Sequence, residues 1–221
     1  MTFNGTMATI KSWSTSSIVC TVPDVQIFQS GNVSVLVRPS VTLTSNSADF
    51  YLILPAITSL TSDTNNIGAR VFIYGQGFGK TQGSVKMGSV DAQIISWSES
   101  AIEIRVPQVA AEGLYNLTVL IGNRSVYKAF TVAGPKKDHY WPSPVGKDDA
   151  FTIYGKYFGE LSDQVTRTIY IKDYGYVTNF TYSDTNLMFT WPVSNSWTGT
   201  KDVEVTISIG GLQQTFTVTA E

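Results

Sequence analysis

Side chains that usually carry catalysis or bind metals are scarce in this sequence. Its 221 residues include a single cysteine, Cys20, and a single histidine, His139. Zinc sites need several Cys or His ligands at set spacings, and the nucleophile of many hydrolases lies in a G-x-S-x-G elbow; neither pattern occurs. The pair Asp148 and Asp149 is interpreted as a solvated turn, with a calcium site as the alternative. We therefore predict no catalytic residues, no cofactor and no metal, and hence a protein that is not an enzyme.

Charge is also sparse. Charged residues make up 14% of the chain and the net charge is −2, against a usual charged fraction of ~25%. Lysines and arginines are scattered singly, without the basic stripe that binds a phosphate backbone, which argues against a nucleic-acid partner. No apolar run approaches the ~18 residues that cross a bilayer, and the N-terminus lacks the features of a signal peptide. We therefore expect membrane attachment only through a segment outside this chain.

One segment of the chain is present nearly three times. TMATIKSWSTSSIVCTVP near the N-terminus is matched 84 residues later by VDAQIISWSESAIEIRVP, which aligns Trp13 with Trp97 and Pro23 with Pro107. A looser third copy, YSDTNLMFTWP, ends at Pro192. Repeats of this length indicate a string of similar small domains.

Strand-like patterns dominate the chain. The clearest segments alternate, or run, in β-branched and aromatic residues and are bounded by Gly, Pro, Asn and Ser. They cover residues 70–74, 101–106, 115–121, 150–154 and 203–209. No segment has a helical period. Short strands with turn signals between them predict an all-β fold made of tandem β-sandwiches.

Aligning the chain with itself places the domain boundaries. VFIYGQGFG begins at Val71 and FTIYGKYFG at Phe151, and each follows a proline, Pro55 or Pro135, at the same distance. We therefore predict three domains, which cover residues 1–54, 55–133 and 134–221. Domain one contains only the C-terminal part of the repeated pattern, so we expect its opening strands to lie outside this sequence. Packing between neighbouring domains is expected to add stability, because units of this size are marginal alone.

These segments carry a family resemblance. The order P-x-I-x-x-L, VFIYGQGFG, VKMGSVDAQIISWSESAIEIRVP and GLYNLTVLIGNRSVYKAFTV, over residues 55–133, resembles the IPT/TIG family of immunoglobulin-like domains. The resemblance implies an early-set (E-set) immunoglobulin sandwich, found in cell-surface receptors, bacterial surface proteins, polysaccharide-active enzymes and some transcription factors. In domain three the expected first strand is replaced by KKDHYWPSP. The Asn/Ser/Thr-rich style is similar to the tiger proteins of social amoebae, which implies a cell-adhesion molecule.

The glycines of the repeated segment are typical of a bulged strand end, where positive φ or close backbone approach is needed. They are Gly75, Gly77, Gly79, Gly155 and Gly159. Phe78 and Phe158 are predicted to fill the core beneath them. The segment GQGFGKT is one residue short of a phosphate loop and no helix is expected after it, so a phosphate site is not predicted.

The self-alignment also interprets the cysteine and the tryptophans. Cys20 aligns with Ile104 and Phe189, which is an apolar strand position, so we expect a buried free thiol. The alternative is a disulfide to a residue outside this chain. Trp13 and Trp97 are interpreted as turn-packing aromatics rather than ligand platforms.

Asparagine sequons suggest a secreted glycoprotein. Five occur, at Asn4, Asn32, Asn116, Asn123 and Asn179. Asn116 alternates with apolar neighbours and should face water. All except Asn179 are expected to lie where a glycan could project from the surface, and idle sequons in a bacterial protein are the alternative.

Domain three concentrates large aromatic residues at expected loops and turns, where we predict a protein-binding face. They are Tyr140, Trp141, Tyr174, Tyr176 and Trp197. Tyr and Trp dominate binding hot spots because they offer large contact area with few rotatable bonds. The alternative is that several of them fill an altered core.

These features together predict an extracellular segment of a cell-surface adhesion or recognition receptor. Its tandem domains are expected to bind a protein partner, another cell-surface protein, in a homophilic or heterophilic contact. The alternative is a spacer or carbohydrate-binding accessory module of a secreted or bacterial surface protein. That alternative requires exposed aromatic residues that form a flat platform.

Overall fold

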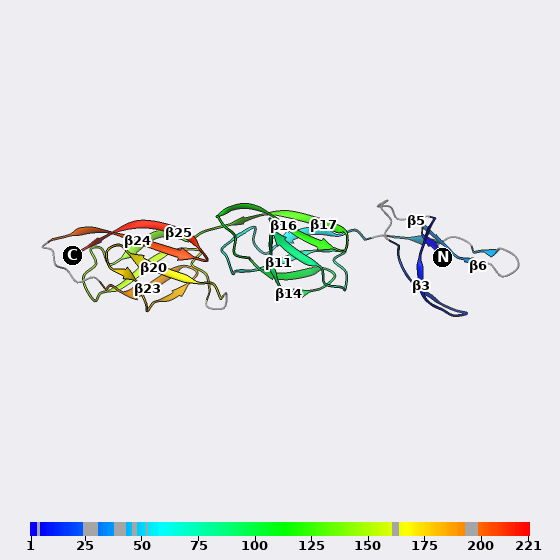
Figure 1. The fold of residues 1–221 in the computed structure, drawn as a ribbon, viewed down its shortest axis with the longest axis horizontal. Coiled ribbons are helices and arrows are strands. Elements are labelled where there is room, and N and C mark those ends of the chain that lie inside the picture. The colour runs from blue at the N-terminus through cyan, green and yellow to red at the C-terminus, as the bar shows by residue number, and fades with distance from the viewer. Residues whose placement is uncertain are drawn as a thin grey trace. The chain divides into compact units, whose positions relative to one another are not determined.

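The computed structural model describes residues 1–3, 5–23, 31–37, 43–45, 48–51, 53–160, 164–192 and 199–221 (Figure 1). The chain divides into two compact units, Met1–Leu54 and Pro55–Glu221. Regular structure in the described residues is entirely β, so no described helix could cross a membrane. The prediction of an all-β fold is confirmed.

The described residues of the first unit form eight short strands. They are β1 (Thr2–Phe3), β2 (Thr6–Met7), β3 (Thr9–Trp13), β4 (Ile18–Thr21), β5 (Gly31–Ser34), β6 (Leu36–Val37), β7 (Leu43–Thr44) and β8 (Ala48–Phe50). One sheet has the order β2-β1-β5-β8, while β3 pairs with β4 and β6 with β7.

Cys20 lies on the inner side of β4, as its pattern predicted. Ile18 and Cys20 are part-buried, whereas Val19 and Thr21 between and beyond them are exposed. The thiol is free among the described residues, and its Sγ lies 3.5 Å from the Met1 Sδ. The expectation of complete burial is wrong, because the β3–β4 sheet has only two strands in the described part of the chain.

Residues 55–133 form two sheets around one hydrophobic core. The five-stranded sheet has the order β10 (Thr64–Asn65), β17 (Arg124–Val132), β16 (Gly113–Ile121), β12 (Ser84–Met87) and β13 (Val90–Asp91). The four-stranded sheet has the order β14 (Gln93–Trp97), β15 (Ala101–Arg105), β11 (Arg70–Gln76) and β9 (Ala56–Leu60). Alternation decides which side chains face inward: Val71 and Ile73 of β11 are fully buried against Leu117 and Val119 of β16. Burial of each such side chain stabilises the folded state by roughly 1.5–3 kcal/mol.

The repeated glycine segment ends β11 opposite a bulge, as the need for close backbone approach predicted, but the extra residue of the bulge, Thr58, belongs to β9 and not to the glycine strand. The register between β11 and β9 shifts between Tyr74 and Gly75. Gly77 and Gly79 have φ angles of 70° and 75°, and Phe78 between them is fully buried. Trp97 closes this corner, because its Nε1 donates a hydrogen bond of 3.0 Å to the carbonyl oxygen of Gly79. Trp97 is thus a packing residue, as interpreted, whereas Trp13 is half exposed.

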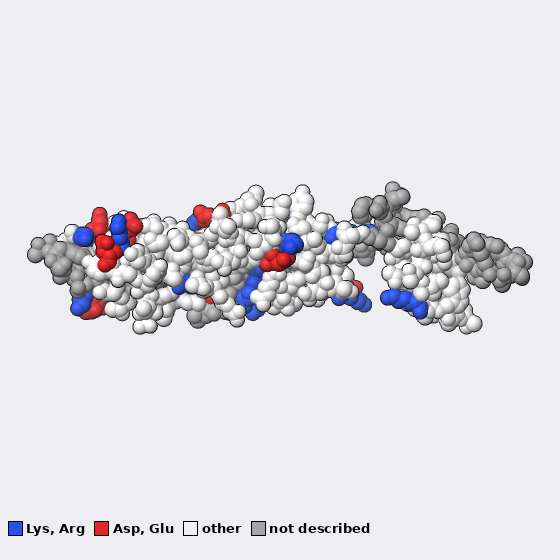
Figure 2. All heavy atoms as spheres, in the orientation of Figure 1, with Lys and Arg blue, Asp and Glu red and all other residues white. Residues whose placement is uncertain are grey.

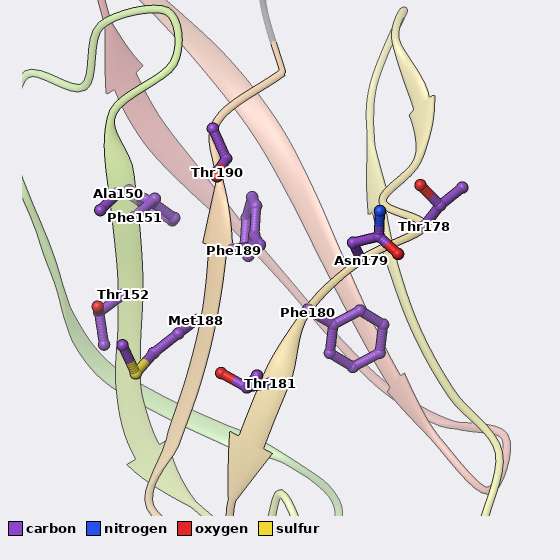
Figure 3. A pocket seen from close by; sticks show the side chains of 10 residues that line it. All are labelled: Ala150, Phe151, Thr152, Thr178, Asn179, Phe180, Thr181, Met188, Phe189 and Thr190. Carbon is purple, nitrogen blue, oxygen red and sulfur yellow. The ribbon is translucent and has the colours of Figure 1, made fainter.

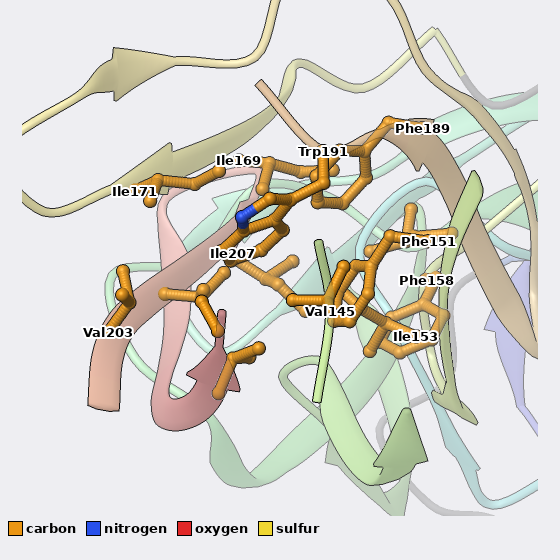
Figure 4. Close-up of a cluster of buried hydrophobic side chains, with 14 of the residues drawn as sticks. Val145, Phe151, Ile153, Phe158, Ile169, Ile171, Phe189, Trp191, Val203 and Ile207 are labelled. Atoms are coloured by element: carbon orange, nitrogen blue, oxygen red, sulfur yellow. The ribbon is translucent and has the colours of Figure 1, made fainter. Parts of the chain in front are cut away.

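Residues 134–221 form the second pair of sheets in this unit. One sheet has the order β18 (Lys136–Trp141), β19 (Ala150–Lys156), β23 (Asn186–Thr190) and β22 (Thr181–Ser183). The other has the order β21 (Gly175–Tyr176), β20 (Arg167–Ile171), β24 (Lys201–Ile209) and β25 (Leu212–Ala220). Their inner faces enclose a separate core in which Trp191 is the largest fully buried side chain among the described residues (Figure 4). Phe158 is also fully buried in that core, as predicted.

The expected loss of the first strand of domain three is wrong. KKDHYW forms β18, which pairs antiparallel with β19 as β9 pairs with β11. A bulge shifts the register between Lys137 and His139. The segment does not look like a strand in sequence because it is polar, which an edge strand tolerates when one of its faces is solvated.

The tip of the β24–β25 hairpin joins domain three to the core of domain two. Leu212 is 6% exposed and belongs to the same hydrophobic cluster as Ile67 and Val106. Gly210 has a φ of 58°, and a Cβ there would lie 3.0 Å from the Ile67 side chain. Val165 packs against both cores. The expected packing between neighbouring domains is therefore present within this unit.

Candidate functional site

The four described residues of the five aromatic residues predicted for an interface do not meet on one surface. Trp197 lies outside the described residues, and Tyr140 points into the sandwich. Its ring centroid lies 5.5 Å from that of Phe151, and its hydroxyl accepts a hydrogen bond of 3.2 Å from the Thr219 N–H. The expected exposure of Tyr140 is therefore wrong: it is a core-facing residue of β18.

The surroundings of Tyr140 also change its acidity. Burial opposes ionisation of the phenol, but the Thr219 N–H, the Ser143 side chain and the Lys137 ammonium favour the phenolate. The net effect is that the pKa of Tyr140 lies below the ordinary value of 10.0.

Tyr174 and Tyr176 are exposed on the β20–β21 hairpin, together with Tyr170. Tyr170 and Tyr176 are paired across the hairpin, and their rings meet edge to face with centroids 5.2 Å apart. Tyr176 is 68% exposed and Tyr174 is 40% exposed. The turn is fixed by Asp173 and Gly175, whose φ angles are 67° and 100°. We name Tyr170, Tyr174 and Tyr176 the tyrosine hairpin.

Trp141 belongs to the other sheet of domain three, where it is 66% exposed. Across the four strands its register partners form a row in the order Trp141, Thr152, Met188 and Thr181. Register partners in a sheet point to the same side, so this row crosses the whole outer face. Met188 at its centre is 48% exposed. We name these four residues the outer row.

A second row lies beside the outer row. It consists of His139, Tyr154, Asn186 and Ser183. The rings of His139 and Tyr154 stack with centroids 4.5 Å apart and planes inclined by 10°. Sequence reasoning missed Tyr154, although its place in the repeated IYG segment matches that of Tyr74, which is also exposed on the outer face of its sheet.

A pocket of about 460 Å³ opens over three of the four residues of the outer row, Thr152, Met188 and Thr181, where β22 diverges from β23. Figure 3 shows Thr152 and Met188 on adjacent strands, with Asn179 and Phe180 on the segment that leads into β22. The complete lining is Ala150, Phe151, Thr152, Thr178, Asn179, Phe180, Thr181, Met188, Phe189 and Thr190. No lining residue is charged. On the face drawn in Figure 2, too, charged side chains are few and stand in small groups among neutral surface.

Three of the five sequons can be placed. Asn116 in β16, Asn123 in the turn after it and Asn179 before β22 are all exposed. The expectation that Asn179 differs from the others is therefore wrong, because the chain around it lies at the surface rather than in the core. Asn4, and the side chain of Asn32, lie outside the described residues. Attachment of glycans stays a prediction.

The residues considered for catalysis or metal binding take part in ring stacking and in a backbone turn. His139, the sole histidine of the chain, is stacked on Tyr154. Asp148 takes a φ of 65° where the repeat has Gly68 with 84°, and Asp149 accepts a hydrogen bond of 2.8 Å from the Gly146 N–H. Among the described residues, no group of three or more His, Cys, Asp or Glu side chains could hold a metal ion. The aspartate pair thus forms a turn, as interpreted.

Comparison with known proteins identifies a family match for residues 55–133. That segment matches the family model described as IPT/TIG domain. Over 53 residues the chain is 45% identical to a cyclomaltodextrin glucanotransferase of Geobacillus stearothermophilus. The aligned segment covers 24% of this chain and 7% of the enzyme. A second such enzyme, from Bacillus sp. (strain 1-1), is 40% identical over 68 residues, which covers 29% of this chain and 10% of the enzyme. The chain therefore spans a small fraction of the length of these curated relatives.

Solved structures are similar over a larger part of the chain. The plexin A4 extracellular region matches with a TM-score of 0.44 and 14% identity, over 76% of this chain and 18% of that chain. The surface glycan-binding protein PbSGBP-B from Prevotella bryantii matches with a TM-score of 0.34 and 13% identity, over 74% of this chain and 41% of that chain. Together with the observed sheets, the family match leads to one conclusion: residues 55–133 are an IPT/TIG domain, an E-set immunoglobulin-like sandwich in an all-β chain.

Proposed function

We propose that this chain is an extracellular segment of a cell-surface recognition or adhesion protein. It has three tandem domains, 1–54, 55–133 and 134–221, and acts by binding a protein partner rather than by catalysis. The exposure of Asn116, Asn123 and Asn179 supports a location where glycans are attached. Membership of the tiger group is part of the proposal and rests on the Asn/Ser/Thr-rich composition.

The tyrosine hairpin is the observation that carries this proposal. It places three large aromatic side chains on one short hairpin, and two of them already contact each other. Because the rings of Tyr170 and Tyr176 already pack against each other, fewer side-chain rotamers would have to be ordered on binding. Tyrosine also combines apolar area with a hydroxyl that can pair with polar groups of a partner. These are the properties of a protein-binding hot spot.

Binding can be tested with the whole chain. Beads coated with the chain would be scored for self-aggregation, which detects a homophilic contact. The labelled chain would also be applied to an array of recombinant ectodomains, which detects a heterophilic contact. We expect Tyr176→Ala to weaken the observed binding by about tenfold or more, the usual effect at a hot spot. Tyr127→Ala, which removes an equally exposed tyrosine from domain two, should leave binding unchanged. Binding that survives replacement of all three hairpin tyrosines would refute the proposed site.

Carbohydrate binding is the second candidate function. The observation in its favour is the exposed Trp141 on a sheet face that also carries the stacked His139 and Tyr154 rings. Such a face provides the flat aromatic surface that an accessory module of a secreted or bacterial surface protein would need. Loss of sugar binding on Trp141→Ala, with tyrosine-hairpin variants unaffected, would favour this second function.

A further inference from the structure

We propose that the pocket between β22 and β23 binds a neutral oligosaccharide, and that Trp141 provides a stacking platform for it at the far end of the outer row. The proposal makes the carbohydrate-binding function specific by naming the site and the ligand class. It does not depend on the protein interface, because the tyrosine hairpin belongs to the other sheet of domain three.

The first argument is geometric. Trp141, Thr152, Met188 and Thr181 are successive register partners on four adjacent strands. Three strand spacings of about 4.8 Å make the row roughly 14 Å wide. Thr152, Met188 and Thr181 also line the pocket, so the platform and the pocket share one continuous face. A ligand that contacts both ends of the row must therefore be longer than a single sugar ring.

The second argument is chemical. Met188 and Phe180 give the pocket an apolar surface, against which the C–H face of a sugar ring can pack. Around them stand the hydroxyls of Thr152, Thr181 and Thr190 and the amide of Asn179, which donate and accept hydrogen bonds as sugar hydroxyls do. This mixture of an apolar floor and a few polar groups is typical of small-ligand sites.

The lining also disfavours other ligand classes. An anionic or cationic ligand would find no counter-charge, because none of the lining residues is charged. A purely apolar ligand would cover the threonine hydroxyls and the Asn179 amide without pairing them, which costs free energy. A neutral polyhydroxylated ligand satisfies both conditions.

The experiment uses the whole chain produced in the bacterial cytoplasm, where no N-glycan is attached beside the pocket. Affinity electrophoresis would be run in gels that contain amylopectin, xyloglucan, mixed-linkage β-glucan or galactomannan, with acidic polygalacturonate as the charged control. We expect retardation by at least one neutral polysaccharide and none by polygalacturonate. Calorimetry with oligosaccharides of the polysaccharide that retards the chain would then give affinities.

Variants assign the binding to this face. Trp141→Ala should lower affinity about tenfold or more, and Thr152→Val, which removes one hydroxyl at nearly constant volume, should lower it several-fold. Met188→Lys gives an independent check, since it places a charge in the pocket at a half-exposed position that does not support the core. Tyr176→Ala on the other sheet should leave affinity unchanged. Thermal unfolding of each variant confirms that it is folded.

Two results would overturn the assignment. One is that no neutral polysaccharide retards the chain. The other is retardation that persists in folded Trp141→Ala, Thr152→Val and Met188→Lys variants, because the ligand would then lie elsewhere. Neither result would contradict the proposed protein interface, which is tested separately with variants of the tyrosine hairpin.

Discussion

Gly155 approaches the backbone of Lys136 so closely that a Cβ on the glycine would lie 1.9 Å from the Lys136 carbonyl oxygen. Gly75 repeats the relationship one domain earlier, where a Cβ would lie 2.1 Å from the carbonyl oxygen of Ala56. In both domains the close contact lies between the bulged first strand, β9 or β18, and the glycine-bearing strand that pairs with it, β11 or β19. This repeated glycine is thus needed for strand pairing rather than for ligand binding.

Replacement of this glycine should be costly. Because the obstructing atom is backbone, Gly75→Ala must shift β9 away from β11, and we expect the free energy of unfolding to fall by about 3 kcal/mol. Gly122→Ala is the matched control, since it has a φ of 59° but no atom within 4 Å of a Cβ. That control should cost only about 1 kcal/mol, for the left-handed backbone. Urea unfolding measures both, and equal losses would contradict the role of the close contact.

Leu212 should stabilise the domain that precedes its own. We expect Leu212→Ala to lower the free energy of unfolding by about 2–3 kcal/mol, because it empties a site in the core of domain two. Amide hydrogen exchange should therefore quicken in β11 and β15, far along the chain from the substitution. Leu114→Ala, at an exposed position of domain two, should change stability by no more than about 0.5 kcal/mol. Unchanged exchange in β11 and β15 would contradict the coupling.

Tyr140 should make stability depend on alkaline pH. Its pKa is lowered in the folded chain, so the folded state releases the proton before the unfolded state does. Stability should then rise as pH increases from the lowered pKa towards the unfolded value of about 10, and the gain should be lost as pH falls through the lowered pKa.

Tyr140→Phe tests this by removing the phenol. It should abolish the alkaline rise and cost about 1 kcal/mol near neutral pH, because the Thr219 N–H loses its acceptor. Denaturant unfolding across the pH range measures both effects, with the exposed Tyr127→Phe as the control. An identical alkaline rise in Tyr140→Phe and in the unaltered chain would rule out this origin.

Secretion from a eukaryotic host should yield a glycosylated chain. We expect glycans at Asn116, Asn123 and Asn179, which are exposed, and a mass decrease on enzymatic deglycosylation. A glycan on Asn179 should weaken oligosaccharide binding, because Asn179 lines the pocket, and the unglycosylated chain from the bacterial cytoplasm should bind more tightly. Asn116→Gln serves as the control that leaves binding unchanged. The absence of any mass change would count against the eukaryotic extracellular origin.

Strands β11, β15 and β16 of domain two were predictable because β-branched and other apolar residues occupy their inward-facing positions, as Val71 and Ile73 do in β11. The first strand of domain three was not, since Lys136 to Trp141 form a polar edge strand whose bulge breaks the alternation. Because the segment is a strand, its neighbouring side chains Tyr140 and Trp141 point to opposite sides, so Tyr140 packs against the core while Trp141 is exposed, whereas both were expected at the surface of a loop. In both cases the pairing partner in β19, rather than the local sequence, decides the direction of the side chain.

The candidate site was less predictable than the fold. Sequence reasoning selected Trp141 and Tyr176 by residue type, but only the strand order shows that they belong to different sheets. The outer row joins residues from four strands whose alignment depends on long-range pairing, so no local pattern brings Trp141 next to Thr152 and Met188.

Leu212 of domain three packs with Ile67 in the core of domain two, and this contact limits how the two domains could be rearranged during evolution. A freely shuffled module needs a surface that is soluble without its neighbour. Recombination that placed a different sandwich after residue 133 would expose Ile67 to solvent. It would also expose Leu212 of domain three, because Leu212 would no longer pack against domain two. Duplication or exchange of these two sandwiches is therefore expected to conserve them as a pair.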